Sequence, residues 1–170
     1  MTSVTIGNSG TTKSVSLATK GGGLSIDSSG NTTYTTNYRT AAYLDSTQAI
    51  GSSGVVAFSK RSFGSGYNTG SHRYTAPCTG CYLLRVNIYF YPSLNNRTYA
   101  MYPRINGSRV AGQGASSFIT GAGSGRYFML NYSGILELSS GDTLDIYYAG
   151  QNSDRIEPDY TSMHIHFLSR

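Results

Sequence analysis

The sequence predicts an all-β protein, a sandwich or jelly roll, and two observations support that fold class. Glycine occurs 21 times and tyrosine 15 times in 170 residues, while only 12% of the residues are charged. Glycine and asparagine supply turn conformations, whereas threonine and tyrosine suit pleated strands. Short apolar runs with period-two alternation recur between turn clusters, and no stretch has the periodicity of an amphipathic helix.

The first 45 residues differ in character from the rest. Short apolar pairs at Val4–Ile6, Val15–Leu17 and Leu24–Ile26 alternate with clusters of turn residues. Each pair is a strand of minimal length, so this segment buries too little to fold by itself. We therefore predict an extended arm or a short fibre shaft at 1–45, in which three chains together bury the apolar residues that one chain leaves exposed. A separate domain is predicted at 46–170. A flexible tail is the alternative for the arm.

Longer strands are expected in the second part. They lie at 55–58, 72–75, 82–91, 99–105, 126–138, 143–148 and 163–168, with turns at 106–107 and 139–142. The longest is Tyr82–Tyr91. Its even-numbered residues from Val86 to Phe90 share one face, and its odd-numbered residues from Asn87 to Tyr91 share the other. Regularly spaced strands with turn signals between them are typical of a sandwich or jelly roll.

Four segments carry a resemblance to a known superfamily. They read GYNTGSHRYTAPCTGCYLLRV from Gly66, INGSRV from Ile105, SGILELSSGDTLDIYY from Ser133 and MHIHFL from Met163. Together they resemble the C1q/tumour-necrosis-factor-like jelly-roll superfamily, from about Val55 to the C-terminus. The resemblance implies a jelly roll that forms a homotrimer through flat sheet faces and that binds rather than catalyses. His164 and His166 depart from the family's small residues at that position.

The two cysteines form a CxxC motif at Cys78 and Cys81. A redox CxxC begins a helix, whereas this motif follows Pro77 and runs into a strand. A structural zinc would need two more ligands nearby, and the sequence has no other cysteine and only three histidines. We therefore predict buried thiols that pack as small apolar side chains, with a disulfide between them as the alternative.

No catalytic motif is evident. The sequence has no G-x-S-x-G, no H-E-x-x-H and no phosphate-binding loop. Asp142 and Asp145 flank a predicted turn, and Asp142 is expected to cap the turn backbone. A carboxylate pair for glycoside hydrolysis is the alternative, and it would make the protein a tail-borne depolymerase. The resemblance favours a non-enzymatic protein.

The charge pattern bears on partners. The net charge is +5, but the basic residues are scattered, so we expect no nucleic-acid partner. No apolar run is long enough to cross a bilayer, and no basic start with an apolar stretch follows Met1. We therefore expect neither membrane insertion nor Sec export. The positive balance favours an acidic partner such as a polysaccharide.

These features together lead to a functional hypothesis. A trimeric jelly roll behind a Gly/Ser/Thr-rich arm without a collagen repeat indicates a phage virion protein, assembled in the host cytoplasm. It would be a fibre or decoration knob on the capsid or tail, with the arm contacting other virion proteins and the knob binding a host-surface glycan. The alternative is a soluble C1q-like or lectin-like recognition module.

Candidate ligand residues lie on and beside the longest strand. Aromatic faces stack on sugar rings and amides bind hydroxyls, so the candidates are Asn87, Tyr89, Tyr91, Asn95 and Tyr99. Packing of these tyrosines between subunits is the alternative, because tyrosine is enriched at interfaces of any kind. The stretches 112–125 and 150–160 are expected to be surface loops that could carry specificity.

His164 and His166 are the candidate metal ligands. They are two apart on a strand, so both side chains point to the same face. A threefold axis would bring together about six imidazoles, which suits an octahedral transition metal. The alternative is that both histidines are satisfied polar residues facing a groove or a subunit boundary. No other cofactor is expected.

Overall fold

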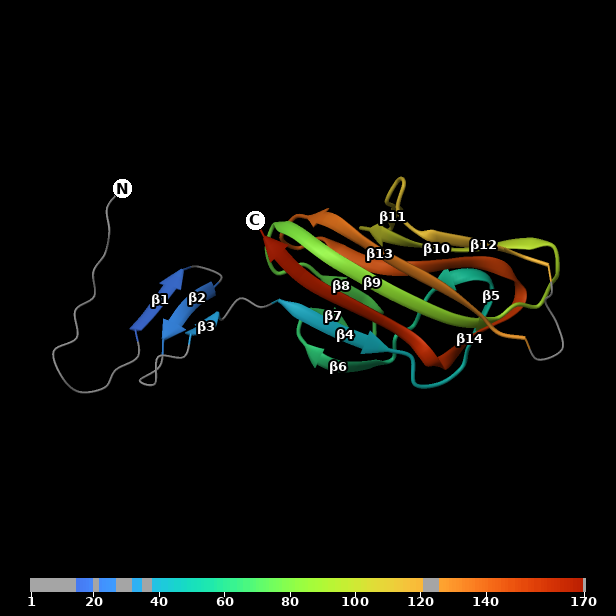
Figure 1. The fold of residues 1–170 in the computed structure, drawn as a ribbon, viewed down its shortest axis with the longest axis horizontal. Helices are drawn as coiled ribbons and strands as arrows, with labels where there is room; N and C mark the ends of the chain where they lie inside the picture. Colours follow the sequence, from blue (N-terminus) through green and yellow to red (C-terminus); the bar gives the residue numbers. More distant parts are fainter. Residues whose placement is uncertain (1–14, 20–21, 27–31, 35–37, 121–125, 170) are drawn as a thin grey trace. The chain divides into compact units, whose positions relative to one another are not determined.

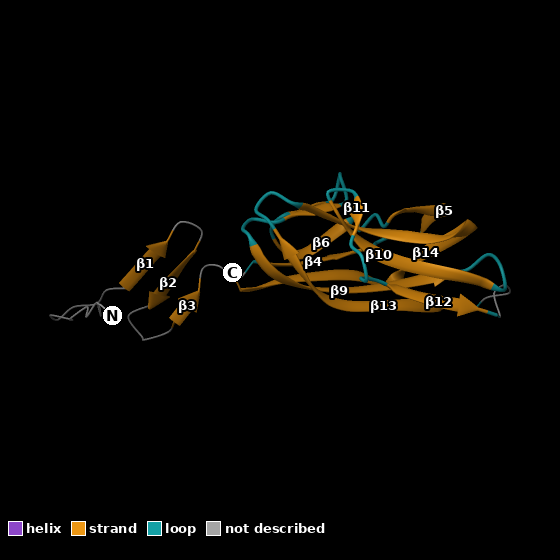
Figure 2. Cartoon of the chain, turned by 90° about the horizontal axis from the view of Figure 1, so that it is seen from above, coloured by secondary structure: helices purple, strands orange, loops and turns teal. Residues whose placement is uncertain are grey.

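The computed structural model describes residues 15–19, 22–26, 32–34, 38–120 and 126–169 (Figure 1). The chain divides into two compact units, Met1–Asn37 and Tyr38–Arg170. The described residues form strands, turns and loops without a helix (Figure 2). Within this part of the chain there is accordingly no helix with the length and apolar character needed to span a bilayer.

The first unit contains a small antiparallel sheet. Its strands are β1 (Val15–Thr19), β2 (Gly22–Ile26) and β3 (Thr32–Tyr34), in the order β1-β2-β3. The predicted strand pairs at 15–17 and 24–26 are therefore confirmed as strands. They hydrogen-bond to one another within one chain. The predicted pair at Val4–Ile6 lies outside the described residues.

The second unit is built on two sheets. Sheet I contains, in order, β13 (Phe128–Leu138), β9 (Gly80–Tyr91), the C-terminal part of β14 (Thr143–Ser169), β4 (Arg39–Tyr43) and β6 (Lys60–Gly64). Sheet II contains β12 (Ala115–Ile119), β10 (Arg97–Ile105), the N-terminal part of β14 and β5 (Gln48–Val55). Three short strands extend sheet II: β11 (Ser108–Arg109), β8 (Arg73–Thr75) and β7 (Tyr67–Asn68).

Strand β14 belongs to both sheets. It pairs with β10 and β5 near its start and with β9 and β4 near its end, and register shifts occur after Ala149 and after Glu157. The prediction of a surface loop at 150–160 is therefore wrong, because its glycine and polar residues lie within a bulged strand. In the other predicted loop, 112–125, β12 occupies part of the stretch, and residues 121–125 lie outside the description.

Strand β4 places the start of the jelly-roll unit before the predicted boundary at residue 46. It pairs with β14 on one side and with β6 on the other, and Thr40, Ala41 and Ala42 are buried. The jelly-roll unit therefore begins at Tyr38 and not at residue 46. Small alanine side chains resemble a connector in sequence, yet they fit a strand that is covered on both faces.

The core lies between the two sheets. Even-numbered residues of β9 from Tyr82 to Phe90 are buried, as the alternation predicts. They pack with core residues of β10 and β14, including Met101 and Ile146. Residues 82–91 and 143–148, both predicted as strands, are thus confirmed. Cys78 and Cys81 are free thiols. Cys78 is buried, as predicted for a small apolar side chain, whereas Cys81 is partly exposed, so the prediction of a buried thiol is wrong for Cys81.

Two predicted turns form as expected. Asn106 and Gly107 have φ values of 51° and 82°, which are typical of the type I′ hairpin turn. Asp142 accepts a hydrogen bond from the Ser139 backbone N–H at 2.8 Å and one from Nδ2 of Asn106 at 2.8 Å. The Asn106 and Ser139 hydrogen bonds lower the pKa of Asp142. Asp142 is therefore a turn-capping residue, as the sequence indicates.

Candidate interaction face of sheet I

The outward side chains of sheet I form the candidate site, which we call the interaction face. Because β14, β9 and β13 are antiparallel neighbours, their register places His164, Arg85 and Ser133 in one row. The adjacent row contains His166 and Leu83. Residues directly opposite each other in antiparallel strands have Cβ atoms about 5 Å apart, so the two histidines and Arg85 form one cluster.

A hollow lies over this cluster. Its volume is about 680 Å³. The lining residues are Leu83, Arg85, Asn87, Asn131, Tyr132, Ser133, His164 and His166. Most of them are polar donors from three adjacent strands, and no described carboxylate lines the hollow. Arg85 is exposed, and within the described part of its own chain it forms no ion pair.

An aromatic cluster lies on the same face. The ring of Tyr89 stacks on Tyr127 with centroids 5.1 Å apart and meets Tyr160 edge-on at 5.3 Å. Tyr127 also contacts Tyr91, and the Arg155 guanidinium lies 4.8 Å from the centre of the Tyr91 ring. Partial burial and then the neighbouring Tyr127 raise the pKa of Tyr89. These rings form a platform rather than isolated contacts.

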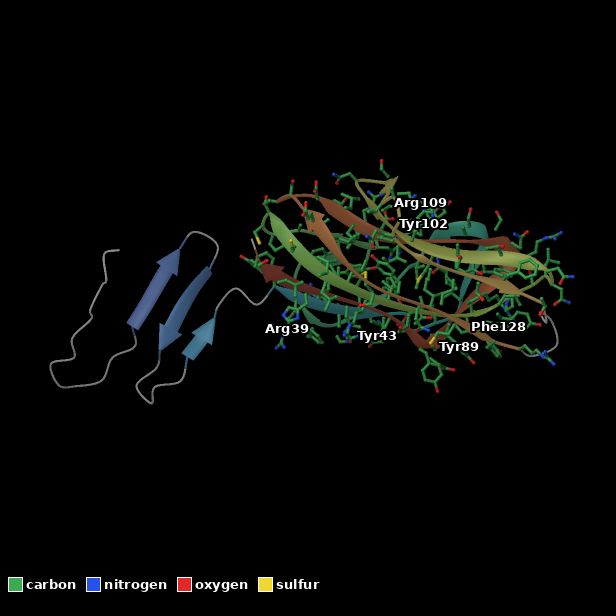
Figure 3. The ribbon with its side chains drawn as sticks, turned by 45° about the horizontal axis from the view of Figure 1, so that its top comes forward. Arg39, Tyr43, Tyr89, Tyr102, Arg109 and Phe128 are labelled. Atoms are coloured by element: carbon green, nitrogen blue, oxygen red, sulfur yellow. The ribbon has the colours of Figure 1, made fainter. Side chains whose placement is uncertain are left out.

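Exposed apolar residues concentrate on this face. The described residues include nine large apolar side chains that are exposed. Six of them lie on the interaction face or on its edge strand β6: Tyr43, Phe63, Tyr127, Met129, Ile135 and Tyr160. In Figure 3, Arg39, Tyr43 and Tyr89 lie along one edge of the domain, and Tyr102 and Arg109 lie along the opposite edge. A concentrated apolar surface marks an interaction site.

The opposite face, on sheet II, carries a stack of arginines and tyrosines. Tyr102 and Tyr147 stack with centroids 5.4 Å apart. The Arg109 guanidinium lies 4.5 Å from the Tyr102 ring centre, and the Arg104 guanidinium lies 4.4 Å from that of Tyr147. The stack is cationic and aromatic, a combination that suits acidic or sugar ligands.

Asp145 anchors that stack and is not a free acid. Its carboxylate is 2% exposed and accepts hydrogen bonds from Nε and Nη2 of Arg104 at 2.7 and 3.1 Å. Arg73 Nε donates a third bond at 3.3 Å. The hydrogen bond with Asp145 raises the pKa of Arg104. Asp142 caps a turn, and Asp145 is held by two arginines. Neither carboxyl group is therefore available to act as the acid in the hydrolytic carboxylate pair that was the alternative from the sequence.

The structure separates the predicted ligand residues. Asn87, Tyr89 and Tyr91 lie on the interaction face, as their shared strand parity indicated. Asn95 is exposed in the turn between β9 and β10. Tyr99 is a correction: it is 0% exposed and its hydroxyl bonds to the backbone of that turn, so it has no surface for a ligand.

Three residues of the face were missed by the sequence prediction. Arg85 has the same strand parity as Asn87, so that signal was present in the sequence. Tyr127 and Tyr160 are far from Tyr89 along the chain, and only the fold brings them together. The candidate metal ligands His164 and His166 share the face, but one chain's described residues contain no group of three or more metal-ligating side chains.

Comparisons with known proteins bear on the fold. No protein-family model and no curated sequence matches the chain. Several solved structures do match in three dimensions. Murine APRIL superposes with a TM-score of 0.59 at 14% identity, over 78% of this chain and 99% of the other. Eiger TNF from S. frugiperda gives 0.60 at 14%, over 78% and 93%. The zebrafish complement 1qA globular domain gives 0.58 at 9%, over 79% and 98%.

The fold is a C1q/TNF-like jelly roll. Sequence identities of 9–14% establish the fold and nothing finer. The resemblance found in the sequence is thereby confirmed at the level of architecture. The compared structures come from mouse, zebrafish and S. frugiperda, and they give no support to a phage origin.

Proposed function

We propose that the protein is a non-enzymatic recognition module that works as a homotrimer, with the interaction face of sheet I as its subunit contact. The observation that carries the proposal is the gathering of six exposed large apolar residues on that face and its edge. The C1q/TNF-like resemblance supports it, since the family it implies assembles through flat sheet faces. A second and a third copy of the chain are therefore the proposed occupants.

The proposal assigns the tyrosine platform to subunit contact. Tyr89, Tyr91 and Tyr127 have partly exposed rings already packed against one another, so they would lose little side-chain entropy on burial. Burial of a large apolar side chain contributes about 1.5–3 kcal/mol. Several such side chains from each of three chains are enough to hold a trimer at micromolar concentration.

Sheet II then remains accessible for a ligand. Its stack of Tyr102, Tyr147, Arg104 and Arg109 is held by the buried Asp145 carboxylate. Ordered guanidinium groups on aromatic rings suit an acidic glycan, because they offer both charged donors and a ring edge. This is the partner class we propose for the module.

Oligomeric state tests the proposal directly. Light scattering on the chain should give a trimer, and Ile135→Glu should shift it to monomer. Ile135 is 57% exposed, so the substitution leaves the fold of one chain intact. Phe118→Glu is the matched control, because Phe118 is 60% exposed on sheet II and should remain trimeric. A monomeric wild type, or equal effects of both substitutions, would overturn the proposed contact.

The virion role remains a prediction from the sequence. It rests on the arm at 1–45 and on the lack of a collagen repeat, and neither the fold nor the comparisons favour it. A trimeric recognition module could be displayed on a particle or could act free in solution. Co-purification of the chain with assembled particles would favour the virion localisation.

A further inference from the structure

We propose that the hollow in the interaction face is a binding site for a tetrahedral oxyanion, sulfate or phosphate, held by Arg85, His164 and His166. The inference rests on the proposed trimer only in one respect: the hollow is open on a single chain, and the other two chains would enclose it. On one chain the donors already converge: Arg85 and His164 are direct cross-strand neighbours, and His166 lies in the next row. Amide and hydroxyl groups of Asn87, Asn131 and Ser133 line the same hollow.

Charge is the main argument for an anion. The basic groups in the middle of the face come from three strands: Arg85 from β9, the two histidines from β14 and Arg39 from β4. Arg39 is directly opposite His166 in the pairing of β4 with β14. Arg39 already lies over the Phe63 ring at 5.4 Å. The acidic group facing outward from β13 is Glu137, which is opposite Cys81 and two rows from Arg85. The hollow itself is therefore basic.

Assembly makes a counter-charge necessary. If three interaction faces meet, three copies of Arg85 leave bulk water together. A buried guanidinium without an anionic partner is strongly destabilising. Within the described part of the chain, Arg85 has no carboxylate partner of its own. A bound oxyanion satisfies several guanidinium and imidazolium donors at once, and the hollow of about 680 Å³ on one chain has room for the anion and for water.

The same geometry disfavours a metal ion in this position. A cation placed at His164 would lie beside the Arg85 guanidinium on the neighbouring strand, and like charges at that separation repel. The described residues also contain no set of three metal-ligating side chains. The two hypotheses differ in their pH dependence, because protonated imidazoles attract an anion but cannot ligate a metal.

The test is isothermal titration calorimetry of the untagged full chain with sodium sulfate and with sodium phosphate. Chloride holds the ionic strength constant, and titrations are run at about pH 6 and about pH 8, because a protonated imidazole attracts an anion more strongly than a neutral one. We expect saturable binding that is tighter at the lower pH. Arg85→Gln should weaken it at least about tenfold, and His164→Gln should reduce its pH dependence.

Two controls make the result decisive. Arg97→Gln removes one exposed arginine from β10 in sheet II, outside both the hollow and the Tyr102–Tyr147 stack, and should leave sulfate affinity unchanged. Light scattering on the same samples reports assembly separately: if the wild type is monomeric, the proposed trimer fails, while titration of that monomer still decides the anion site. The inference is overturned if neither anion binds saturably at the lower pH. Equal loss in Arg85→Gln and Arg97→Gln would also overturn it, as would zinc or nickel binding that strengthens toward pH 8 without any anion binding.

Discussion

Asp154 occupies the point where β14 passes from sheet II to sheet I, and its carboxylate is 0% exposed. Oδ1 accepts hydrogen bonds from the N–H and hydroxyl of Ser93, both at 2.8 Å. Oδ2 accepts from the Gln151 N–H at 2.5 Å and from the Tyr148 hydroxyl at 3.1 Å. Gly150 permits this clamp, since a Cβ there would collide with Oδ2. Burial and the charge on Asp154 raise the pKa of Tyr148.

Substitution Asp154→Asn should destabilise the fold by about 2–4 kcal/mol. The new amide group would replace Oδ2 and face the Gln151 N–H, a donor that cannot turn away. One orphaned backbone donor costs about 1–3 kcal/mol, and the loss of charge from the remaining hydrogen bonds costs about 1 kcal/mol more. Tyr148→Phe removes one donor and leaves three, so it should cost only about 1–2 kcal/mol.

Urea unfolding followed by circular dichroism, at one fixed protein concentration, measures both effects. With a slope of about 2 kcal/mol per molar urea, the Asp154→Asn midpoint should fall by about 1–2 M. Asp159→Asn is the control for loss of charge, because Asp159 is exposed on the same strand; it should change stability by less than about 0.5 kcal/mol. If Asp154→Asn changes stability as little as this control, the Asp154 carboxylate does not stabilise the passage of β14 from sheet II to sheet I.

Three further outcomes are expected. Deletion of residues 1–37 should leave a folded jelly roll, whereas deletion of 1–45 also removes β4 and should give an unstable or insoluble product, as thermal melting would show; equal stability of the two would contradict the observed boundary. Hydrogen bonds to its carboxylate lower the pKa of Asp142, so its contribution is present at neutral pH and lost as the pH falls through that lowered pKa. The stability gap between wild type and Asp142→Asn should therefore shrink from about pH 7 to about pH 3, and a constant gap would argue against the cap. Because Cys78 and Cys81 are free, thiol titration of the unfolded chain should give two equivalents, and a reductant should leave the unfolding midpoint unchanged; a midpoint that falls with reductant would reveal a disulfide.

Features that depend on near neighbours in the chain were predictable from the sequence. The alternation of Val86 to Phe90 against Asn87 to Tyr91 follows from the two-residue period of a strand, and it places both sets correctly. The turn at Asn106–Gly107 follows from residues that tolerate positive φ. The jelly-roll fold was also predictable, because four segments of the sequence resemble a known superfamily.

Features that depend on pairing between distant segments required the tertiary structure. Residues 150–160 have the composition of a loop, yet they form a strand because β5 and β9 offer hydrogen-bonding edges on either side. Tyr99 has the chemistry of a ligand residue, yet its side of β10 faces the core. Arg85 and His164 become neighbours only through strand register. Strand period is a local property of the chain, whereas register and sheet membership are set by which distant edges pair, so the basic hollow could not be located from the sequence.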